Sequence, residues 1–390
     1  MEEENTNQEF MMKMKKIKLY PDKEQRTLLN SWFQTSRYVY NKTLEYLKHD
    51  TFNKLNKQSL RNKFVTANHK KQENSPKNNE VEEWEKLTPK IIRAQAVFEI
   101  VKNYKTAFTN LKEGNIKFFE MKRKKDSKLT DSIGIENGCS MTKNNGIKLF
   151  PKFMKKPIKI GKRQTKELKN WKFEHDNYIH FDGKNYILMS PFKVSYLDKN
   201  VTNNKIISLD PGYRTFLTGY DPDGKIISYH RYDDKIKKTK LKIDKLKSLR
   251  EKLKKNFKRK IINLEIKTKN LIDDLHWRCI NSLKDYDTVI LPNFENQKVA
   301  MKSKNKKLNR DIYTYSHYKF KVRLENTFKV LRKKVIIVTE EFTSKTCGNC
   351  GILNNNLGSN KIFQCDNCNL KIDRDYNGAR NILLKTIMSF

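Results

Sequence analysis

The sequence is poor in cysteine, in acidic residues and in long apolar segments. Six of its 390 residues are cysteine, and no run of 18 apolar residues occurs anywhere in it. A membrane-spanning helix needs about 20 consecutive apolar residues, and no signal peptide opens the sequence. We therefore expect an intracellular protein in a reducing compartment, with no membrane partner and with cysteines that serve as thiols or metal ligands.

The low acidic content leaves a large positive charge without internal balance. Lys and Arg together number 83 against 44 for Asp and Glu, which gives a formal net charge of +39. Such an excess destabilises a compact chain by self-repulsion unless a polyanion neutralises it, so nucleic acid is the expected partner. An anionic membrane surface could also neutralise this charge, and a lysine-biased genome could produce it without any partner.

Four of the six cysteines form two Cys-x-x-Cys pairs, Cys347/Cys350 and Cys365/Cys368, with fourteen residues between the pairs. This spacing is typical of a zinc ribbon, in which four thiolates close a tetrahedral structural Zn²⁺ site. The alternative is two disulfides, which a reducing compartment disfavours.

Two acidic positions are candidates for a second kind of metal site. Asp375 lies in the sequence DRDYNGARN (373–381), where an acidic residue at a loop-to-helix junction precedes small residues that permit close packing. Asp210 ends a short apolar strand and is followed by Pro211-Gly212 and by two further strands, about 215–220 and 226–229. Each aspartate also has a structural alternative, a helix N-cap in the first case and a turn residue in the second.

The intervening chain alternates between helical and strand patterns. A helix is expected from Pro21-Asp22 onward, a second over about 88–111, and a basic helical segment over 235–260 followed by a helix to about 283. Short alternating runs between 117 and 189, beginning with 117–121, predict a small β-barrel.

Several of these segments resemble the TnpB and Fanzor proteins, which are transposon-associated, RNA-guided DNA endonucleases related to type V CRISPR effectors. The matching segments are LDPG (209–212), TSKTCGNCG (343–351), DRDYNGARN (373–381) and the N-terminal KIKLYP (16–21) with its following helix. The resemblance is thin over 45–85 and 125–200.

The resemblance implies an α+β multidomain fold, in which an RNase H-like (RuvC) nuclease domain carries an inserted zinc ribbon and a wedge-type β-barrel carries an inserted helical bundle. The implied ranges are 1–20 and 112–203 for the barrel, 21–111 for the helical recognition bundle, 204–342 and 374–390 for the nuclease domain, and 343–373 for the ribbon.

One position departs from the TnpB pattern. TnpB proteins end the strand at 288–291 in a glutamate that completes an acidic triad, whereas this chain has Pro292 there. Fanzor proteins lack that glutamate and carry one just before a TSKTC-like motif, which favours Glu340, with Glu341 in reserve, over the awkwardly placed Glu295. The resemblance thus implies that Asp210, Glu340 and Asp375 hold two catalytic Mg²⁺ ions.

The resemblance also implies the partners. These are an omega-type guide RNA, with one protein chain per RNA, and a double-stranded DNA target, in the nucleus if the host is eukaryotic or a virus of eukaryotes. The basic cluster Lys122, Arg123, Lys124 and Lys125 is the candidate nucleic-acid contact, with a solvated loop or a nuclear-localisation signal as alternatives. Because the usual glutamate is missing, a catalytically silent RNA- or DNA-binding zinc-ribbon protein of transposition or transcription stays a second hypothesis.

Overall fold

The chain divides into two compact units, Met12–Lys193 and Val194–Phe390, the latter together with the residues before Met12. The computed structural model describes residues 10–48, 54–66, 81–125, 130–143, 145–169, 171–197, 204–212, 214–230, 232–253, 256–293, 310, 313–339, 341–355, 357–358 and 360–388.

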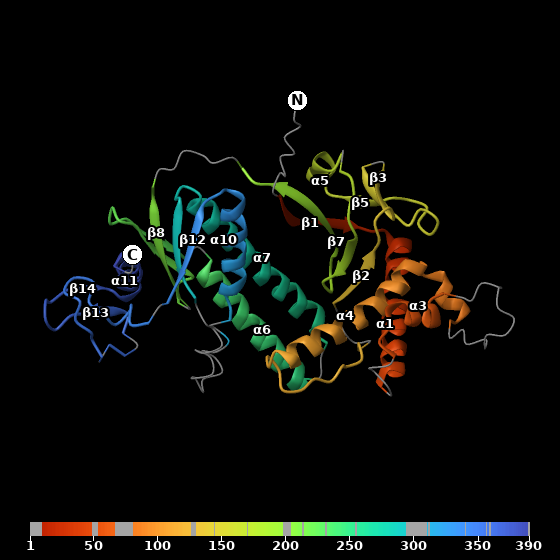
Figure 1. Cartoon of the computed structure of the whole chain (residues 1–390), viewed down its shortest axis with the longest axis horizontal. Coiled ribbons are helices and arrows are strands. Elements are labelled where there is room, and N and C mark those ends of the chain that lie inside the picture. Colours follow the sequence, from red (N-terminus) through yellow and green to blue (C-terminus); the bar gives the residue numbers. More distant parts are fainter. Residues whose placement is uncertain are drawn as a thin grey trace, which may run out of the picture. The chain divides into compact units, whose positions relative to one another are not determined.

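Seven strands of the first unit form one sheet that curls into a nearly closed barrel (Figure 1). The alternation expected from the sequence is clear in its first strand, where Ile17 and Leu19 are buried in the barrel and Lys18 faces solvent. The strands are β1 (Phe10–Tyr20), β2 (Asp131–Ile135), β3 (Ser140–Lys143), β4 (Gly146–Leu149), β5 (Ile158–Ile160), β6 (Asn177–Phe181) and β7 (Tyr186–Ser195).

Their order in the sheet is β2-β6-β7-β1-β5-β4-β3, so the N-terminal strand lies at the centre of strands that follow the helices in sequence. The helices are therefore an insertion into the sheet, as predicted. These inserted helices are α1 (Lys23–Lys48), α3 (Lys57–Phe64), the 3-10 helix η1 (Glu83–Leu87) and α4 (Lys90–Lys112). The short helix α5 (Lys162–Glu167) lies instead between β5 and β6.

Helix α1 joins the barrel core to the helical core. Near its start, Trp32 packs edge-on against Phe150 of the barrel, with ring centroids 5.4 Å apart. Further along, Leu44 belongs to a separate apolar cluster with Val97 and Ile100 of α4. Because the barrel and these helices belong to one compact unit, the predicted boundaries between them stay a prediction.

The strand predicted over 117–121 is wrong, because this segment has no regular structure. Its aromatic residue Phe119 packs instead against α4, with ring centroids 5.1 Å from Phe108 and 6.2 Å from Tyr104. The apolar side chains that suggested a strand are therefore used in packing against a helix rather than in a sheet.

The second unit contains a mixed five-stranded sheet with helices on both faces. Its first three strands, which include the two strands expected after Asp210, are antiparallel, and the next two join in parallel. The elements are β8 (Ile206–Pro211), β9 (Leu217–Tyr220), β10 (Ile226–Tyr229), α6 (Asp233–Leu253), α7 (Lys258–Leu283), β11 (Thr288–Pro292), α10 (His317–Val330), β12 (Lys334–Val338) and α11 (Arg374–Ile387).

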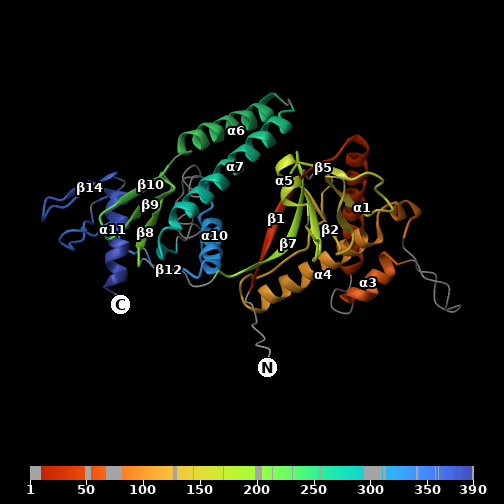
Figure 2. The same ribbon diagram turned by 90° about the horizontal axis from the view of Figure 1, so that it is seen from above.

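The sheet order β10-β9-β8-β11-β12 places β8 in the middle. Alternate residues of β8 point to opposite faces: Leu209 joins the core formed with α7 and α10, and Ser208 faces α11. The α6–α7 pair, whose helices lie side by side in Figure 2, supplies the crossover that a parallel β8–β11 pairing requires. The predicted basic helix over 235–260 is two elements, since α6 ends at Leu253 and α7 begins at Lys258.

A small ribbon is inserted in the chain between β12 and α11. It contains the two-stranded hairpin β13 (Ile362–Gln364) and β14 (Lys371–Asp373), which lies next to α11 in Figure 1. Within the part of the chain that the structure describes, every helix is too short or too polar to cross a bilayer.

Candidate active site and cysteine cluster

Asp210 lies near the end of the central strand β8. It pairs with Thr218 of β9, and on the other side of β8 the parallel register sets Ser208 beside Ile290 of β11. Continuing this register by two residues brings Pro292 beside Asp210. The residue adjacent to Asp210 on β11 is therefore a proline, at the position where TnpB proteins carry a glutamate.

Helix α11 packs against the face of β8 that carries Asp210. The Oγ of Ser208 donates a hydrogen bond of 2.7 Å to the carbonyl of Ala379. At Gly378 the approach is so close that a Cβ there would lie 2.6 Å from Oδ2 of Asp210. An alanine at 378 would therefore have to displace the Asp210 carboxylate.

Asp375 lies one helical turn before Gly378, on the same side of α11. The structure therefore brings Asp375 and Asp210 to one corner, where the end of β8 meets the first turn of α11. Burial, reinforced by the neighbouring Asp373, raises the pKa of the Asp375 carboxyl, while Arg214 opposes this shift. A partly desolvated carboxylate beside other acids is suited to binding a divalent cation.

The predicted third carboxylate cannot be placed, because Glu340 and Glu295 both lie outside the described residues. The reserve candidate Glu341 is exposed, and its backbone carbonyl accepts a hydrogen bond of 3.4 Å from Lys385. Asp210 and Asp375 are therefore the two predicted acidic residues that the structure places, and their role as metal ligands stays a prediction.

The four predicted cysteines form a single cluster. Their sulfur atoms all lie within 4.8 Å of one another, with 3.5 Å for both Cys347–Cys368 and Cys350–Cys365. Disulfide bonds would require about 2.05 Å, whereas a tetrahedral ion with metal–sulfur bonds of about 2.3 Å needs sulfur separations near these values. The cluster could hold a zinc ion, and the disulfide alternative is wrong.

The two cysteine turns are built alike. Gly351 and Asn369 each directly follow the second cysteine of a pair and adopt positive φ values of 78° and 57°. In each turn, the N–H of this residue donates to the carbonyl of the first cysteine of the pair. In the second turn, the Asn349 side chain and the Leu370 backbone lower the pKa of the Cys368 thiol to about 6, which favours the thiolate form.

Two asparagines that the sequence analysis did not single out connect the cysteine cluster with the acidic corner. Asn377 and Asn381 are buried on α11, and their side-chain amides bond backbone groups on either side of Cys347. A sequence signal existed, since two amides four residues apart lie on one helical face, but their backbone partners could not be inferred.

The basic cluster at 122–125 is divided in its contacts. Lys122, Arg123 and Lys125 are exposed, whereas Lys124 forms a 2.7 Å ion pair with Glu99 and lies over the Tyr40 ring at 4.4 Å. Lys124 also lines a pocket of about 440 Å³ between α1, α4 and β2.

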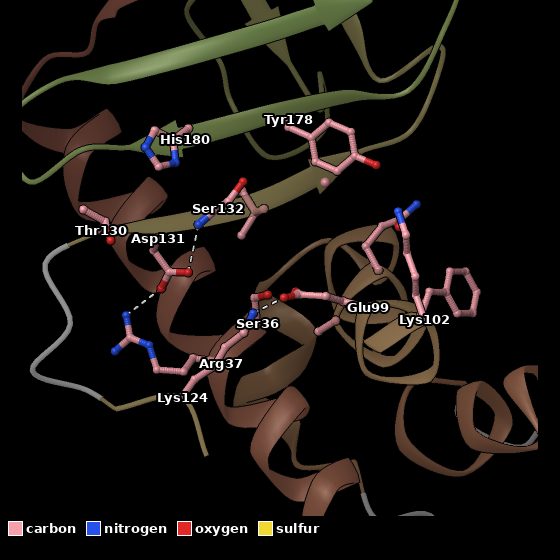
Figure 3. A pocket seen from close by; sticks show the side chains of 15 residues that line it. Ser36, Arg37, Glu99, Lys102, Lys124, Thr130, Asp131, Ser132, Tyr178 and His180 are labelled. Carbon is pink, nitrogen blue, oxygen red and sulfur yellow. Dashed lines mark hydrogen bonds and ion pairs between the residues drawn. The ribbon is translucent and has the colours of Figure 1, made fainter. Parts of the chain in front are cut away.

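This pocket is drawn in Figure 3. The Arg37–Asp131 ion pair, 2.7 Å long, crosses its wall, and His180 and Tyr178 of β6 border it. The charges of Arg37 and Asp131 in this pocket are therefore paired with each other.

Comparison with known protein families gives two matches. Residues 317–382 match the Cas12f1-like, TNB domain, a range that includes α10, β12, the ribbon and most of α11. Residues 11–51 match a helix-turn-helix domain family and include most of β1 and all of α1.

A solved structure shares the fold. The cryo-EM structure of a Cas12f1–sgRNA–target DNA complex contains a chain that superimposes with a TM-score of 0.50 at 16% identity, over 96% of this chain and 98% of that one. At this identity the likeness concerns the fold, and it agrees with the predicted α+β architecture.

Viral relatives match over nearly the whole chain. The putative transposase A625R of Paramecium bursaria Chlorella virus 1 is 31% identical over 395 residues, which cover 96% of this chain and 87% of the relative. TnpB-like protein L770 of Acanthamoeba polyphaga mimivirus is 29% identical over 94% of this chain and 72% of its own length. The chain belongs to the family of these viral TnpB-like proteins, as its motifs predicted.

Proposed function

We propose that this chain is an RNA-guided DNA endonuclease of the TnpB/Fanzor type, which hydrolyses phosphodiester bonds with two Mg²⁺ ions. The observation that carries this proposal is the approach of Gly378 to Asp210, which brings two acidic segments of a TnpB-like chain to one corner. Membership of the family and the shared Cas12f1 fold support the same activity.

Asp210 and Asp375 would hold the ions, together with Glu340. Strand β12 is the second strand from β8 in the sheet, and Val338 pairs with Pro292 in the row that includes Asp210. Strand β12 ends at Val338, two residues before Glu340, which lies outside the described residues. The resemblance to Fanzor proteins favours Glu340 over Glu341, and the viral TnpB-like relatives fit that resemblance.

Asp210, Glu340 and Asp375 would hold Mg²⁺, whose chemistry when bound would be to activate the attacking water and to stabilise the leaving 3′ oxygen. The protein's part is to hold carboxylate oxygens from three segments at fixed positions around the scissile phosphate. Burial and the neighbouring Asp373 raise the pKa of the Asp375 carboxyl because they disfavour its negative charge, and bound cations would offset this cost.

The cysteine cluster would hold one structural Zn²⁺. Four thiolates at the observed separations fill a tetrahedral shell and leave no position for a substrate. The ion would therefore stabilise the ribbon rather than take part in hydrolysis.

Guide RNA and double-stranded DNA are the proposed partners. The net charge of +39 suits a polyanion of considerable size, and the Cas12f1 chain with this fold was solved with an sgRNA and target DNA. In such systems base pairing between the guide RNA and the DNA selects the target sequence, while the protein contacts the sugar-phosphate backbone of the RNA–DNA duplex.

The test is to express the protein with the DNA that flanks its gene, sequence the RNA that copurifies, and measure Mg²⁺-dependent cleavage of a matched target. Asp210→Ala and Asp375→Ala should each abolish cleavage and leave RNA binding intact. Asp223→Ala, which removes an exposed aspartate from a turn of the same unit, is the matched control and should cleave normally. Cleavage by either active-site variant would refute the assignment.

A catalytically silent nucleic-acid binder is the second candidate, and Pro292 beside Asp210 favours it. It predicts that the purified complex binds a matched DNA target but leaves it intact at every Mg²⁺ or Mn²⁺ concentration. The endonuclease predicts cleavage under the same conditions, so one titration separates the two.

A further inference from the structure

The first turn of α11, which carries Asp375, is held by the ribbon hairpin. Asp373 ends β14, pairs with Ile362 of β13, and accepts a hydrogen bond of 2.9 Å from the N–H of Asp375. The next residue, Arg374, donates from its backbone to Lys361 at 2.8 Å and from its guanidinium to Gly358 at 2.9 Å. The start of the helix is thus fastened to the ribbon through backbone groups.

The second turn of α11 is held by the other half of the ribbon, at the first cysteine turn. Asn377 donates to the carbonyl of Thr346 at 2.7 Å and accepts from the N–H of Gly348 at 3.0 Å. These two residues flank Cys347, so one asparagine side chain brackets a predicted zinc ligand.

Asn381, one turn further along, strengthens the same attachment. It donates to the carbonyls of Thr343 and Thr346 at 2.8 and 2.7 Å. A Cβ on Gly348 would lie 2.9 Å from Oδ1 of Asn377, so the turn is packed directly on the helix. Since these amides are buried, losing their partners would cost desolvation free energy.

Among the described residues, the apolar core of the ribbon is small. Leu357 and Phe363 are buried beside the cysteines, the partly buried Leu370 and Ile372 pack against them, and each strand is three residues long. A two-stranded hairpin of this kind is at best marginally stable in water, and structural zinc sites contribute folding free energy directly. The order of both attachments to α11 should therefore depend on the metal.

We propose that Asn377 and Asn381 are positioning residues that couple zinc in the cysteine cluster to the placement of Asp375. When zinc is lost, the ribbon loosens, both attachments of α11 are released, and Asp375 leaves its position opposite Asp210. The coupling is reciprocal, so ordering of α11 also strengthens zinc binding. Under the proposed function, the consequence is that zinc at the cysteines controls metal binding at the corner of Asp210 and Asp375. This consequence rests on the proposed function.

The primary experiment measures hydrogen exchange of the full-length protein by mass spectrometry, with zinc bound and after removal by a chelator. Zinc removal should speed exchange in peptides that cover 374–383 by at least about tenfold and leave peptides from β8 unchanged. Asn377→Leu should show the fast exchange with zinc still bound and should release zinc several-fold faster to a chromogenic chelator.

Asn354→Leu is the matched control, because Asn354 bonds the backbone of Gln364 inside the ribbon. It should leave exchange in 374–383 close to wild type. A zinc-free wild-type protein whose 374–383 exchange is unchanged would overturn the inference, and so would an Asn377→Leu protein that behaves like Asn354→Leu. The unchanged β8 peptides distinguish a local effect from general unfolding.

A second measurement separates this inference from the proposed function. Mn²⁺ binding, followed by its electron paramagnetic resonance signal, should weaken several-fold at the acidic corner when zinc is removed. If exchange responds to zinc but no Mn²⁺ binds with zinc present, the coupling holds and the proposed two-metal nuclease fails. If the zinc-free protein still cleaves DNA and its exchange in 374–383 stays at the zinc-bound rate, the proposed nuclease function stands and the proposed coupling fails.

Discussion

Gly378 of α11 lies against the carboxylate of Asp210, so closely that a single added carbon would lie 2.6 Å from Oδ2. A glycine inside a helix costs about 1 kcal/mol of stability relative to alanine. The chain has Gly378 at a position where an alanine would displace the Asp210 side chain.

Gly378→Ala should therefore separate activity from stability. The added methyl must push the Asp210 carboxylate aside, so cleavage should fall at least about tenfold, while the gain in helix propensity keeps the melting temperature within a few degrees of wild type. Gly161→Ala is the matched control, since the nearest atom to its Cβ would be 3.9 Å away. Unchanged cleavage by Gly378→Ala would show that Asp210 is not needed at this position.

The proline beside Asp210 permits a relocation test. Glu340→Gln should abolish cleavage, and Glu341→Gln should leave it near wild type, because the resemblance to Fanzor proteins assigns the third carboxylate to Glu340. The double variant Pro292→Glu, Glu340→Gln should recover measurable Mg²⁺-dependent cleavage, since the register brings position 292 next to Asp210. Loss of activity in Glu341→Gln, with Glu340→Gln active, would reverse the assignment.

A buried histidine should make the second unit sensitive to acid. His276 bonds the Tyr315 carbonyl at 2.7 Å and the Arg323 guanidinium at 3.1 Å; because the guanidinium can only donate, the imidazole is neutral with its proton on Nε2. Burial lowers its pKa from 6.5 to about 4. As the pH falls, His276 therefore takes up a proton in the unfolded chain before it does so in the folded protein. Its contribution to the free energy of unfolding is fully present above about pH 6.5 and is lost as the pH drops toward 4.

The measurement is the free energy of unfolding in urea at pH 7.5 and pH 5. The loss attributable to His276 should be on the order of 1 to 2 kcal/mol, within the limit set by its pKa shift. His276→Gln should reduce that loss, and replacement of the exposed His230 by Gln should not. An equal pH dependence in all three proteins would contradict the prediction.

The basic cluster should divide into two kinds of lysine. Lys122→Ala with Lys125→Ala should weaken RNA binding several-fold at low salt and flatten its salt dependence, because both side chains are exposed. Lys124→Ala should instead lower the stability of the Met12–Lys193 unit by about 1 to 2 kcal/mol, since it removes the Glu99 ion pair and the contact with Tyr40. Equal effects of the three lysines on RNA affinity would favour a uniformly solvated cluster.

Motifs with a fixed local geometry could be read from the sequence. The cysteine spacing predicted the sulfur cluster, and the apolar run ending in Asp210-Pro211 predicted the central strand and its turn. Both depend on residues that are close in sequence or chemically restrictive.

Other features depend on contacts between distant segments. Phe119 could have belonged to a strand or to a helix-packing segment, and its contact with Phe108 decided this. Lys124 is charged like its neighbours, and its pairing depends on Glu99, a residue of α4. Asn377 and Asn381 bond backbone carbonyls, and no side chain in the sequence indicates which carbonyls these are.

The link between Ser208 and Ala379 spans 171 positions of the chain. During synthesis, β8 leaves the ribosome long before α11, and the ribbon emerges between them. A nascent chain that contains Asp210 thus has no Asp375 to complete the corner. Under the proposed function, it could not cleave DNA until α11 has been synthesised and has docked on β8.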